Sequence, residues 1–303
     1  RSGQDHRFGG RATFPLAAFA EVALQNGRAV LGAGAGVEDL AILRPLLLPD
    51  RGGVELQSVV GADGGWQVFA RGADGGWTLH ATAKLASAPA PEPAWDAGLA
   101  SAIATPGAAV YGGLTQFGFD YRPAFRGLKD LTMVAEGVIA HAELPKESGS
   151  AVDYLVHPAL LDACLVASSA ILPQLGPGVT WMPRGIGRVA VFAPAGGAVT
   201  ATLRLRDDPA ARTCHVDLLL RDAAGQLVAQ LDGVAFARIA HGADVEDEGL
   251  ATRPELLRLR WQRADLSAPP ALRLFALLGD DAAMVRQLAD ALAARGQVAA
   301  DHP

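Results

Sequence analysis

Two apolar helical segments, one in each half of the chain, most constrain how this chain can fold. The first, FPLAAFAEVALQNG at residues 14–27, has Pro15 in its first turn and Gly27 at its expected end. The second, HPALLDACLVASSAIL at residues 157–172, has Pro158 in its first turn. Both are apolar on almost every side, which is typical of a buried helix. Each helix therefore needs other elements to cover it.

Runs of β-forming residues are available to cover both helices. Three of them, VELQSVV, WQVFARG and WTLHATAKL, lie between residues 54 and 85 and are separated by glycine-rich turns. Strands around residues 131–144 precede the second helix, and further runs follow between residues 188 and 239. We expect an α+β fold in which a long buried helix is wrapped by an antiparallel sheet, twice over. This arrangement is called a double hotdog.

Changes in composition predict the domain boundaries. We expect an N-terminal hotdog half at 1–87, a Pro/Ala-rich linker at 88–108 and a C-terminal half at 109–240. Only RSGQD precedes the first motif, so we expect the leading strands of the first half to be missing, which would leave its helix uncovered. An acidic, aperiodic linker at 241–254 then leads into 255–303, which reads as the start of an α/β region without a GxGxxG motif.

Charge and composition exclude several classes of protein. The net charge of −6 argues against a nucleic-acid partner and offers no basic patch for anionic lipid. No apolar run reaches the roughly 18 residues that span a bilayer, and no signal peptide opens the chain, so we expect a globular cytoplasmic protein. Cys164 in an apolar helix and Cys214 at the start of a strand are expected to be reduced core thiols.

Asp162 is the first candidate catalytic residue. It is the only charged residue between Pro158 and Leu172. Burial of an unpaired carboxylate costs several kcal/mol unless it takes up a proton or finds a partner. A carboxyl group with a pKa raised by burial would keep its proton near neutral pH and could donate it to a leaving group. The alternative is an aspartate on a solvated edge or one that caps a nearby loop.

His6 is the second candidate. It opens the segment HRFGGRATFP, in which Gly10 would let the backbone approach a ligand closely and Pro15 begins the apolar helix. A neutral imidazole suits removal of a proton α to a thioester. His157, directly before Pro158, is expected to stabilise the start of its helix instead. The remaining histidines have no metal-ligand spacing, and no metal site is expected: His80, His141, His215, His241 and His302.

These motifs together resemble the dehydratase domains of modular polyketide synthases, which are double hotdogs. HRFGGRATFP matches the HxxxGxxxxP motif of that family, and HPALLD at residues 157–162 matches the opening of its aspartate motif. FDYRPAFRGL is similar to the family's YGPxF segment at Tyr121, Pro123 and Phe125, with Arg122 in place of the glycine. The resemblance covers roughly residues 1–240, and the tail resembles the ketoreductase structural region that often follows.

The resemblance implies an activity. The substrate would be a β-hydroxyacyl thioester on the phosphopantetheine arm of an acyl carrier protein, with no metal or redox cofactor. His6 would take the α-proton while Asp162 protonates the departing hydroxyl, giving an enoyl thioester and water. Tyr121 would either hydrogen-bond near the leaving group or only pack there. The implied partners are the carrier protein, neighbouring synthase domains including a ketoreductase, and a second copy in a homodimer.

Val166 departs from the family pattern, which has Gln or His four residues after the aspartate. Loss of that donor would raise the pKa of Asp162 and loosen its rotamer. Related domains with altered residues here include pyran-forming cyclases and double-bond isomerases. Dehydration followed by oxa-Michael closure of a pyran ring is therefore the alternative to dehydration alone. An isomerase and a catalytically silent structural domain are further alternatives, and a hotdog thioesterase fits less well because it would not need HPALLD.

Overall fold

The computed structural model describes residues 2–90, 95, 100–175, 178–206, 213–240, 274–277 and 298–301. The chain divides into two compact units, residues 1–255 and 256–303. None of the helices within the described ranges is long and apolar enough to cross a membrane.

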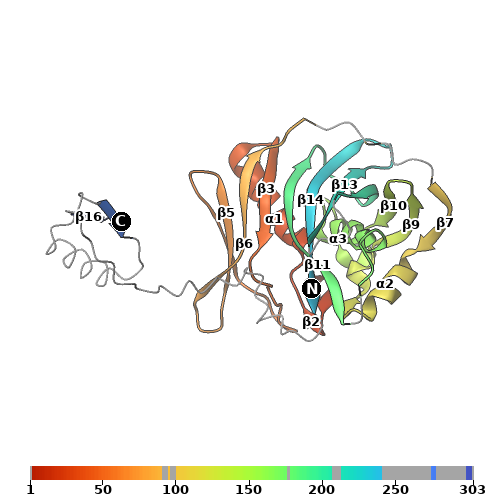
Figure 1. Ribbon diagram of the computed structural model, residues 1–303, viewed down its shortest axis with the longest axis horizontal. Coiled ribbons are helices and arrows are strands. Elements are labelled where there is room, and N and C mark those ends of the chain that lie inside the picture. The colour runs from red at the N-terminus through yellow and green to blue at the C-terminus, as the bar shows by residue number, and fades with distance from the viewer. Residues whose placement is uncertain are drawn as a thin grey trace, which may run out of the picture. The chain divides into compact units, whose positions relative to one another are not determined.

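An antiparallel sheet of eleven strands dominates the larger unit. Its strands are β3 (Ala35–Ile42), β4 (Leu56–Val60), β5 (Gly65–Arg71), β6 (Trp77–Ser87), β7 (Ala100–Pro106), β9 (Leu128–Val134), β10 (Gly137–Glu143), β11 (Val179–Val191), β12 (Ala198–Leu205), β13 (Thr213–Arg221) and β14 (Leu227–Ala240). Their order is β4-β5-β6-β3-β11-β14-β13-β12-β10-β9-β7. Figure 1 shows β5, β6 and β3 toward one end of the sheet and β10, β9 and β7 toward the other. The two halves join where β3 pairs with β11.

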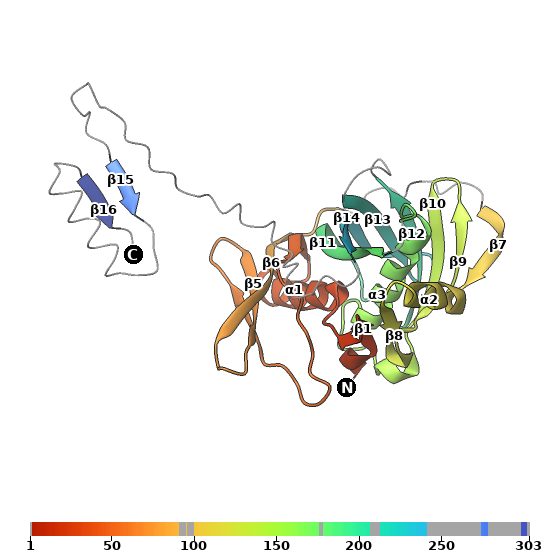
Figure 2. The ribbon, with the colours of Figure 1, turned by 60° about the horizontal axis from the view of Figure 1, so that its bottom comes forward.

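Two central helices lie on one side of this sheet (Figure 2). Helix α1 (Leu16–Leu31) packs on β3, β6 and β11, and helix α3 (Pro158–Val166) packs on β9, β10 and β12. The two helices also contact each other. A third helix, α2 (Gly107–Thr115), lies against β7 and β9. One central helix against each half of the sheet is the double hotdog that the sequence predicted.

Both central helices differ in length from the prediction. Helix α1 does not stop at Gly27 but continues to Leu31, and Gly32 follows it with a φ of +89°. Gly27 lies inside the helix, where an added Cβ would come within 3.2 Å of the Cβ of Ala35. This glycine therefore allows close packing of the helix on β3 instead of ending the helix. Helix α3 is only nine residues long, and the 3-10 helix η4 (Ala167–Ala170) extends it.

Two strands of the large sheet were not expected from the sequence. Strand β3 lies between the first helix and the first predicted run, and it pairs with both β6 and β11. Residues 100–106, inside the segment predicted as a linker over 88–108, form β7 and pair with β9. The expected uncovered first helix does not occur in the described part of the chain. Strands that follow α1 in the sequence cover it.

The smaller unit is described only at two strands. Strands β15 (Leu274–Leu277) and β16 (Val298–Asp301) pair in parallel. The linker predicted at 241–254 and the rest of the expected α/β region at 255–303 lie outside the described residues.

Candidate active site

A second, three-stranded sheet positions His6. Its strands are β1 (His6–Phe8), β2 (Arg11–Ala12) and β8 (Phe119–Tyr121), in the order β2-β1-β8. The register places His6 opposite Tyr121. Gly9 and Gly10 make the turn between β1 and β2 with φ angles of +56° and +78°. An added Cβ on Gly10 would meet nothing within 4 Å in the described part of the chain, so the positive φ of the turn, and not protein packing, favours glycine here.

The hydrogen bonds of His6 determine which of its nitrogens can act as a base. The side chain is buried, and Nδ1 lies 3.0 Å from the carbonyl oxygen of Thr13 and 2.9 Å from Thr13 Oγ1. A carbonyl oxygen only accepts, so Nδ1 carries the hydrogen of the neutral ring. Nε2 is therefore the nitrogen with a free lone pair. It lies 3.7 Å from Oδ1 of Asp162.

Helix α3 carries Asp162 from the other half of the molecule. Pro158 is the first residue of the helix and His157 is its N-cap, with Nδ1 accepting a hydrogen bond of 3.1 Å from the backbone N–H of Ala159. Burial lowers the pKa of His157, so the ring stays neutral and Nδ1 remains an acceptor. His157 thus stabilises the start of the helix, as the sequence predicted.

Asp162 lies buried among apolar side chains. Its Oδ2 atom is enclosed and has no hydrogen-bond partner in the described part of the chain. Burial raises the pKa of this carboxyl, and the nearby His6 opposes the effect only in part. Val166, one turn further along the helix, is buried as well and offers no donor. The carboxyl group is held by packing and not by hydrogen bonds to its second oxygen.

Aromatic rings enclose the pair. The rings of Tyr121 and Phe125 lie 5.4 Å and 5.5 Å from the imidazole of His6. Burial, followed by the proximity of Asp162, raises the pKa of Tyr121 well above its ordinary value, so its hydroxyl keeps its proton.

Pro123 begins the 3-10 helix η2 (Pro123–Phe125), whose Ala124 N–H donates to Asp5. Arg122 has a φ of −94°, so the position occupied by glycine in the family motif does not require glycine here.

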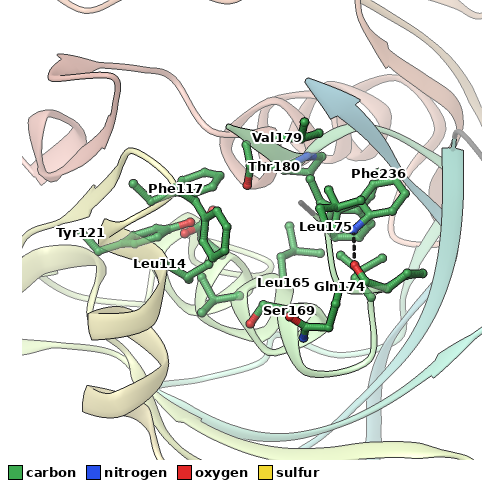
Figure 3. Close-up of a pocket in the computed structure, with 17 residues that line it drawn as sticks. Leu114, Phe117, Tyr121, Leu165, Ser169, Gln174, Leu175, Val179, Thr180 and Phe236 are labelled. Carbon is green, nitrogen blue, oxygen red and sulfur yellow. Dashed lines mark hydrogen bonds between the residues drawn. The ribbon is translucent and has the colours of Figure 1, made fainter. Parts of the chain in front are cut away.

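A cavity opens beside Asp162 and Tyr121 (Figure 3). Its remaining walls come from α2, the segment after it, β8, α3, η4, the segment after η4, β11 and β14, and most of the lining residues are apolar. The lining residues are Leu114, Phe117, Phe119, Leu165, Val166, Ser169, Leu172, Pro173, Gln174, Leu175, Val179, Thr180, Trp181, Pro183 and Phe236. Sequence reasoning identified only Val166 among these. The spacing of Asp162, Val166 and Ser169 on one helical face could have identified Ser169 as well.

Comparison with known proteins agrees with this architecture. Residues 87–246 match the family model described as polyketide synthase dehydratase N-terminal domain, and residues 3–71 match the model described as polyketide synthase dehydratase domain. The chain belongs to the polyketide synthase dehydratase family. Dehydratase domains of this family are in general hydro-lyases.

Curated relatives of this dehydratase are large synthases. The chain is 34% identical over 278 residues to polyketide synthase GfsA of Streptomyces halstedii, which covers 86% of this chain and 4% of that protein. It is 37% identical over 211 residues to mycoketide-CoA synthase of Mycobacterium tuberculosis, covering 66% of this chain and 5% of that protein. The chain thus spans only a small share of the relatives that it matches.

Solved structures with the same fold are dehydratase domains. The domain from the CurJ module of curacin polyketide synthase superposes with a TM-score of 0.70 at 22% identity, covering 78% of this chain and 86% of that one. The domain of a mycocerosic acid synthase-like synthase gives a TM-score of 0.63 at 27% identity, covering 81% of this chain and 88% of that one. These similarities establish the double hotdog fold for the dehydratase.

The predicted site residues of the dehydratase separate into two groups. His6, Tyr121 and Asp162 come together from both halves of the molecule. The others hold the backbone that presents them or line the cavity: Gly10, Pro15, Pro123, His157, Pro158 and Val166. Pro15 lies one position earlier than expected, at the N-cap of α1.

Proposed function

We propose that this dehydratase removes water from a β-hydroxyacyl thioester, with His6 as the base and Asp162 as the acid. The product is an enoyl thioester. One observation carries the proposal, which is that Nε2 of His6 lies 3.7 Å from Oδ1 of the buried Asp162. The reaction needs a protonated acid beside the base, and burial favours the protonated form of Asp162 by raising its pKa.

The reaction divides between the two residues. His6 Nε2 takes the proton from the α-carbon, and the electrons of that C–H bond form the double bond to the β-carbon. The bond from the β-carbon to its hydroxyl breaks, and Asp162 gives its proton to the departing oxygen, which leaves as water. His6 then holds an extra proton and Asp162 lacks one, so a proton passes from the first residue to the second before the next turnover.

Tyr121 is proposed to assist departure of the hydroxyl by donating a hydrogen bond. Its protonated hydroxyl group belongs to a ring that lines the cavity beside Asp162. Packing alone also accounts for an aromatic ring at this position. A Tyr121→Phe variant separates the two roles, since it keeps the ring and removes only the donor. A lower kcat with unchanged thermal stability would support the donor role.

The direct test uses a synthetic β-hydroxyacyl pantetheine thioester. Mass spectrometry should detect loss of one water, and NMR should detect a new alkene. His6→Ala and Asp162→Asn should each abolish turnover while the protein remains folded. Two inactive mutants of the dehydratase from the CurK module, one aspartate to asparagine and one histidine to phenylalanine, have solved structures with this fold. Unchanged turnover in both variants of the present chain would refute the assigned roles.

Dehydration followed by ring closure is the second candidate. It is favoured by Val166, which leaves Oδ2 of Asp162 without the donor that the family motif supplies. The same two residues would first eliminate water and then assist addition of a distal hydroxyl to the enoyl β-carbon. A substrate with such a hydroxyl distinguishes the outcomes. A ring ether without an alkene indicates the cyclase, a shifted alkene indicates an isomerase, and an unchanged mass from folded protein indicates a silent domain.

The proposed partners follow from the thioester. An acyl carrier protein would deliver the substrate on its phosphopantetheine arm, and the curated relatives are synthases that the chain covers only in small part. We also propose a ketoreductase among the neighbouring domains and a homodimer as the assembled state. Cross-linking of the chain to a carrier protein loaded with a mechanism-based pantetheine probe tests the first partner. Mass measurement in solution by light scattering tests the homodimer.

A further inference from the structure

The cavity lies on the Asp162 side of the proposed catalytic pair. Asp162 and Tyr121 line it, whereas His6 is not among its lining residues. If His6 acts on the α-carbon and Asp162 on the oxygen of the β-carbon, the part of the acyl chain beyond the β-carbon must continue on the Asp162 side. The cavity therefore receives the tail of the acyl chain, and this step rests on the proposed function.

Two hydroxyl groups interrupt the apolar walls of this cavity. Thr180 on β11 is 5% exposed, and Ser169 on η4 follows Asp162 by seven residues on the same helical face. In the described part of the chain, neither side-chain hydroxyl has a hydrogen-bond partner. Figure 3 shows Thr180 on the upper wall and Ser169 on the lower wall, with Leu165 between them in the view.

A buried hydroxyl without a partner is unfavourable when the cavity is filled by hydrocarbon. A purely aliphatic tail would displace water from Thr180 and Ser169 and leave both groups unsatisfied. A tail with an oxygen substituent would satisfy them, because a hydroxyl can both donate and accept a hydrogen bond. Sites built in this way reject analogues that lack the matching polar group.

We propose that this cavity selects acyl chains that carry an oxygen substituent, a hydroxyl or a carbonyl, beyond the β-carbon. Thr180 and Ser169 form the polar subsite for that oxygen. Leu165, Phe117 and Phe236 pack against the hydrocarbon on either side of it. The two hydroxyls act on specificity, and neither takes part in the elimination.

The test uses matched pairs of β-hydroxyacyl pantetheine thioesters of equal length. One member carries a hydroxyl at a position beyond the β-carbon, placed at each carbon in turn, and the other carries a methylene there. For the best position, wild-type kcat/KM should favour the oxygenated member about tenfold or more. Thr180→Val keeps the volume of the side chain and should lower this preference several-fold, by raising KM for the oxygenated member alone. Ser169→Ala should act in the same direction.

A matched control and a binding measurement keep the test independent of turnover. Thr200→Val changes a half-buried threonine on β12 that does not line the cavity, so it should leave the preference unchanged. Calorimetry with unreactive thioether analogues of both members measures the same preference as a ratio of Kd values. If the oxygenated analogue binds more tightly only when Thr180 and Ser169 are present, the subsite stands even where no substrate is dehydrated.

Three results would overturn the subsite. The first is a wild-type protein that dehydrates both members equally well, which would leave the proposed function intact. The second is a preference that neither Thr180→Val nor Ser169→Ala changes. The third is an equal loss of affinity in these variants for an analogue that has the pantetheine arm but no acyl tail, because the cavity would then hold the carrier arm.

Discussion

Each central helix carries one buried carboxylic acid, and the two have opposite surroundings. Glu21 on α1 accepts hydrogen bonds from the backbone N–H groups of Leu155 and Val156 at 2.9 Å and 3.0 Å, and from the side chain of Gln25 at 2.7 Å. Asp162 on α3 has one oxygen with no partner among the described residues. A fully satisfied carboxylate stabilises structure, whereas an unsatisfied carboxyl is available for chemistry.

The position of Glu21 links the two acids. Leu155 and Val156 lie directly before His157, the N-cap of α3, so Glu21 fastens the start of the helix that carries Asp162. Glu21 itself belongs to the helix that follows the His6 motif. A carboxylate in the first half of the molecule thus stabilises the start of the helix that carries Asp162 in the second half. We therefore expect substitution of Asp162 to lower activity and substitution of Glu21 to lower stability.

The largest effect on activity is expected for Asp162→Asn. Loss of the proton donor should lower kcat about a thousandfold or more, because a positioned general acid contributes on the order of 10² to 10⁴. The free energy of unfolding at pH 8 should stay the same or rise, since a buried carboxyl with an unsatisfied oxygen is removed. Turnover assays together with urea unfolding measure both quantities. A folded variant with wild-type kcat would show that Asp162 is not the proton donor and would contradict the contrast with Glu21.

Glu21→Ala should have the largest effect on stability. It leaves two buried backbone N–H groups without an acceptor, which should lower the free energy of unfolding by about 3 kcal/mol. Urea unfolding checks this value. Glu21→Gln is the matched control and should lose less, because its amide retains one acceptor oxygen. If the alanine variant lost activity but no stability, Glu21 would belong with the chemistry and the contrast between the two acids would be wrong.

The pH dependence of stability should distinguish the two acids next. Burial raises the pKa of Asp162 above its ordinary value of 3.8, so above that pH the folded state holds a proton that the unfolded state has released. Stability contributed by this proton is complete below pH 3.8 and decreases as the pH rises through the raised pKa. The difference in unfolding free energy between wild type and Asp162→Asn should therefore change with pH in this range. A constant difference would contradict the raised pKa.

Val166→Gln should have the smallest effect and should sharpen the comparison by giving Asp162 a donor. A hydrogen bond to the charged form of Asp162 lowers the pKa of this carboxyl. The alkaline limb of the kcat profile should move to lower pH, because dehydration needs Asp162 protonated. Val166→Leu is the matched control without a donor. An identical profile for the glutamine variant would show that position 166 does not reach the carboxyl.

The two candidate catalytic residues could be predicted from the sequence more fully than their surroundings. A single acid in an apolar helix, together with the motif around His6, indicated Asp162 and His6, and the structure brings the two side chains to 3.7 Å. Neither β3 nor β7 was predicted as a strand. The position of β7 within a Pro/Ala-rich segment is typical of a linker, and this composition concealed the strand. Glu21 was also missed. The two backbone N–H groups that it binds lie more than 130 residues away, and no local pattern connects them to Glu21.

The hexapeptide GADGGW, which occurs at residues 61–66 and again at 72–77, separates what sequence determines from what tertiary structure decides. Both copies form the same turn, in which Asp63 and Asp74 each accept a hydrogen bond of 3.0 Å from the N–H two residues on. Gly64 and Gly75 have φ angles of +81° and +83°. These interactions are local, so identical residues produce identical turns.

The two tryptophans that end the repeats differ in solvent exposure. Trp66 is fully buried and its ring N–H donates to Ser58, whereas Trp77 is 42% exposed. The difference arises because Trp66 enters the core cluster formed with α1, while Trp77 begins β6 outside that cluster. Sequence alone therefore determined the turns and the apolar helices, and it indicated the two candidate catalytic residues. Tertiary structure decided which side chains those elements bury and bring together, since burial depends on contacts between residues distant in the chain.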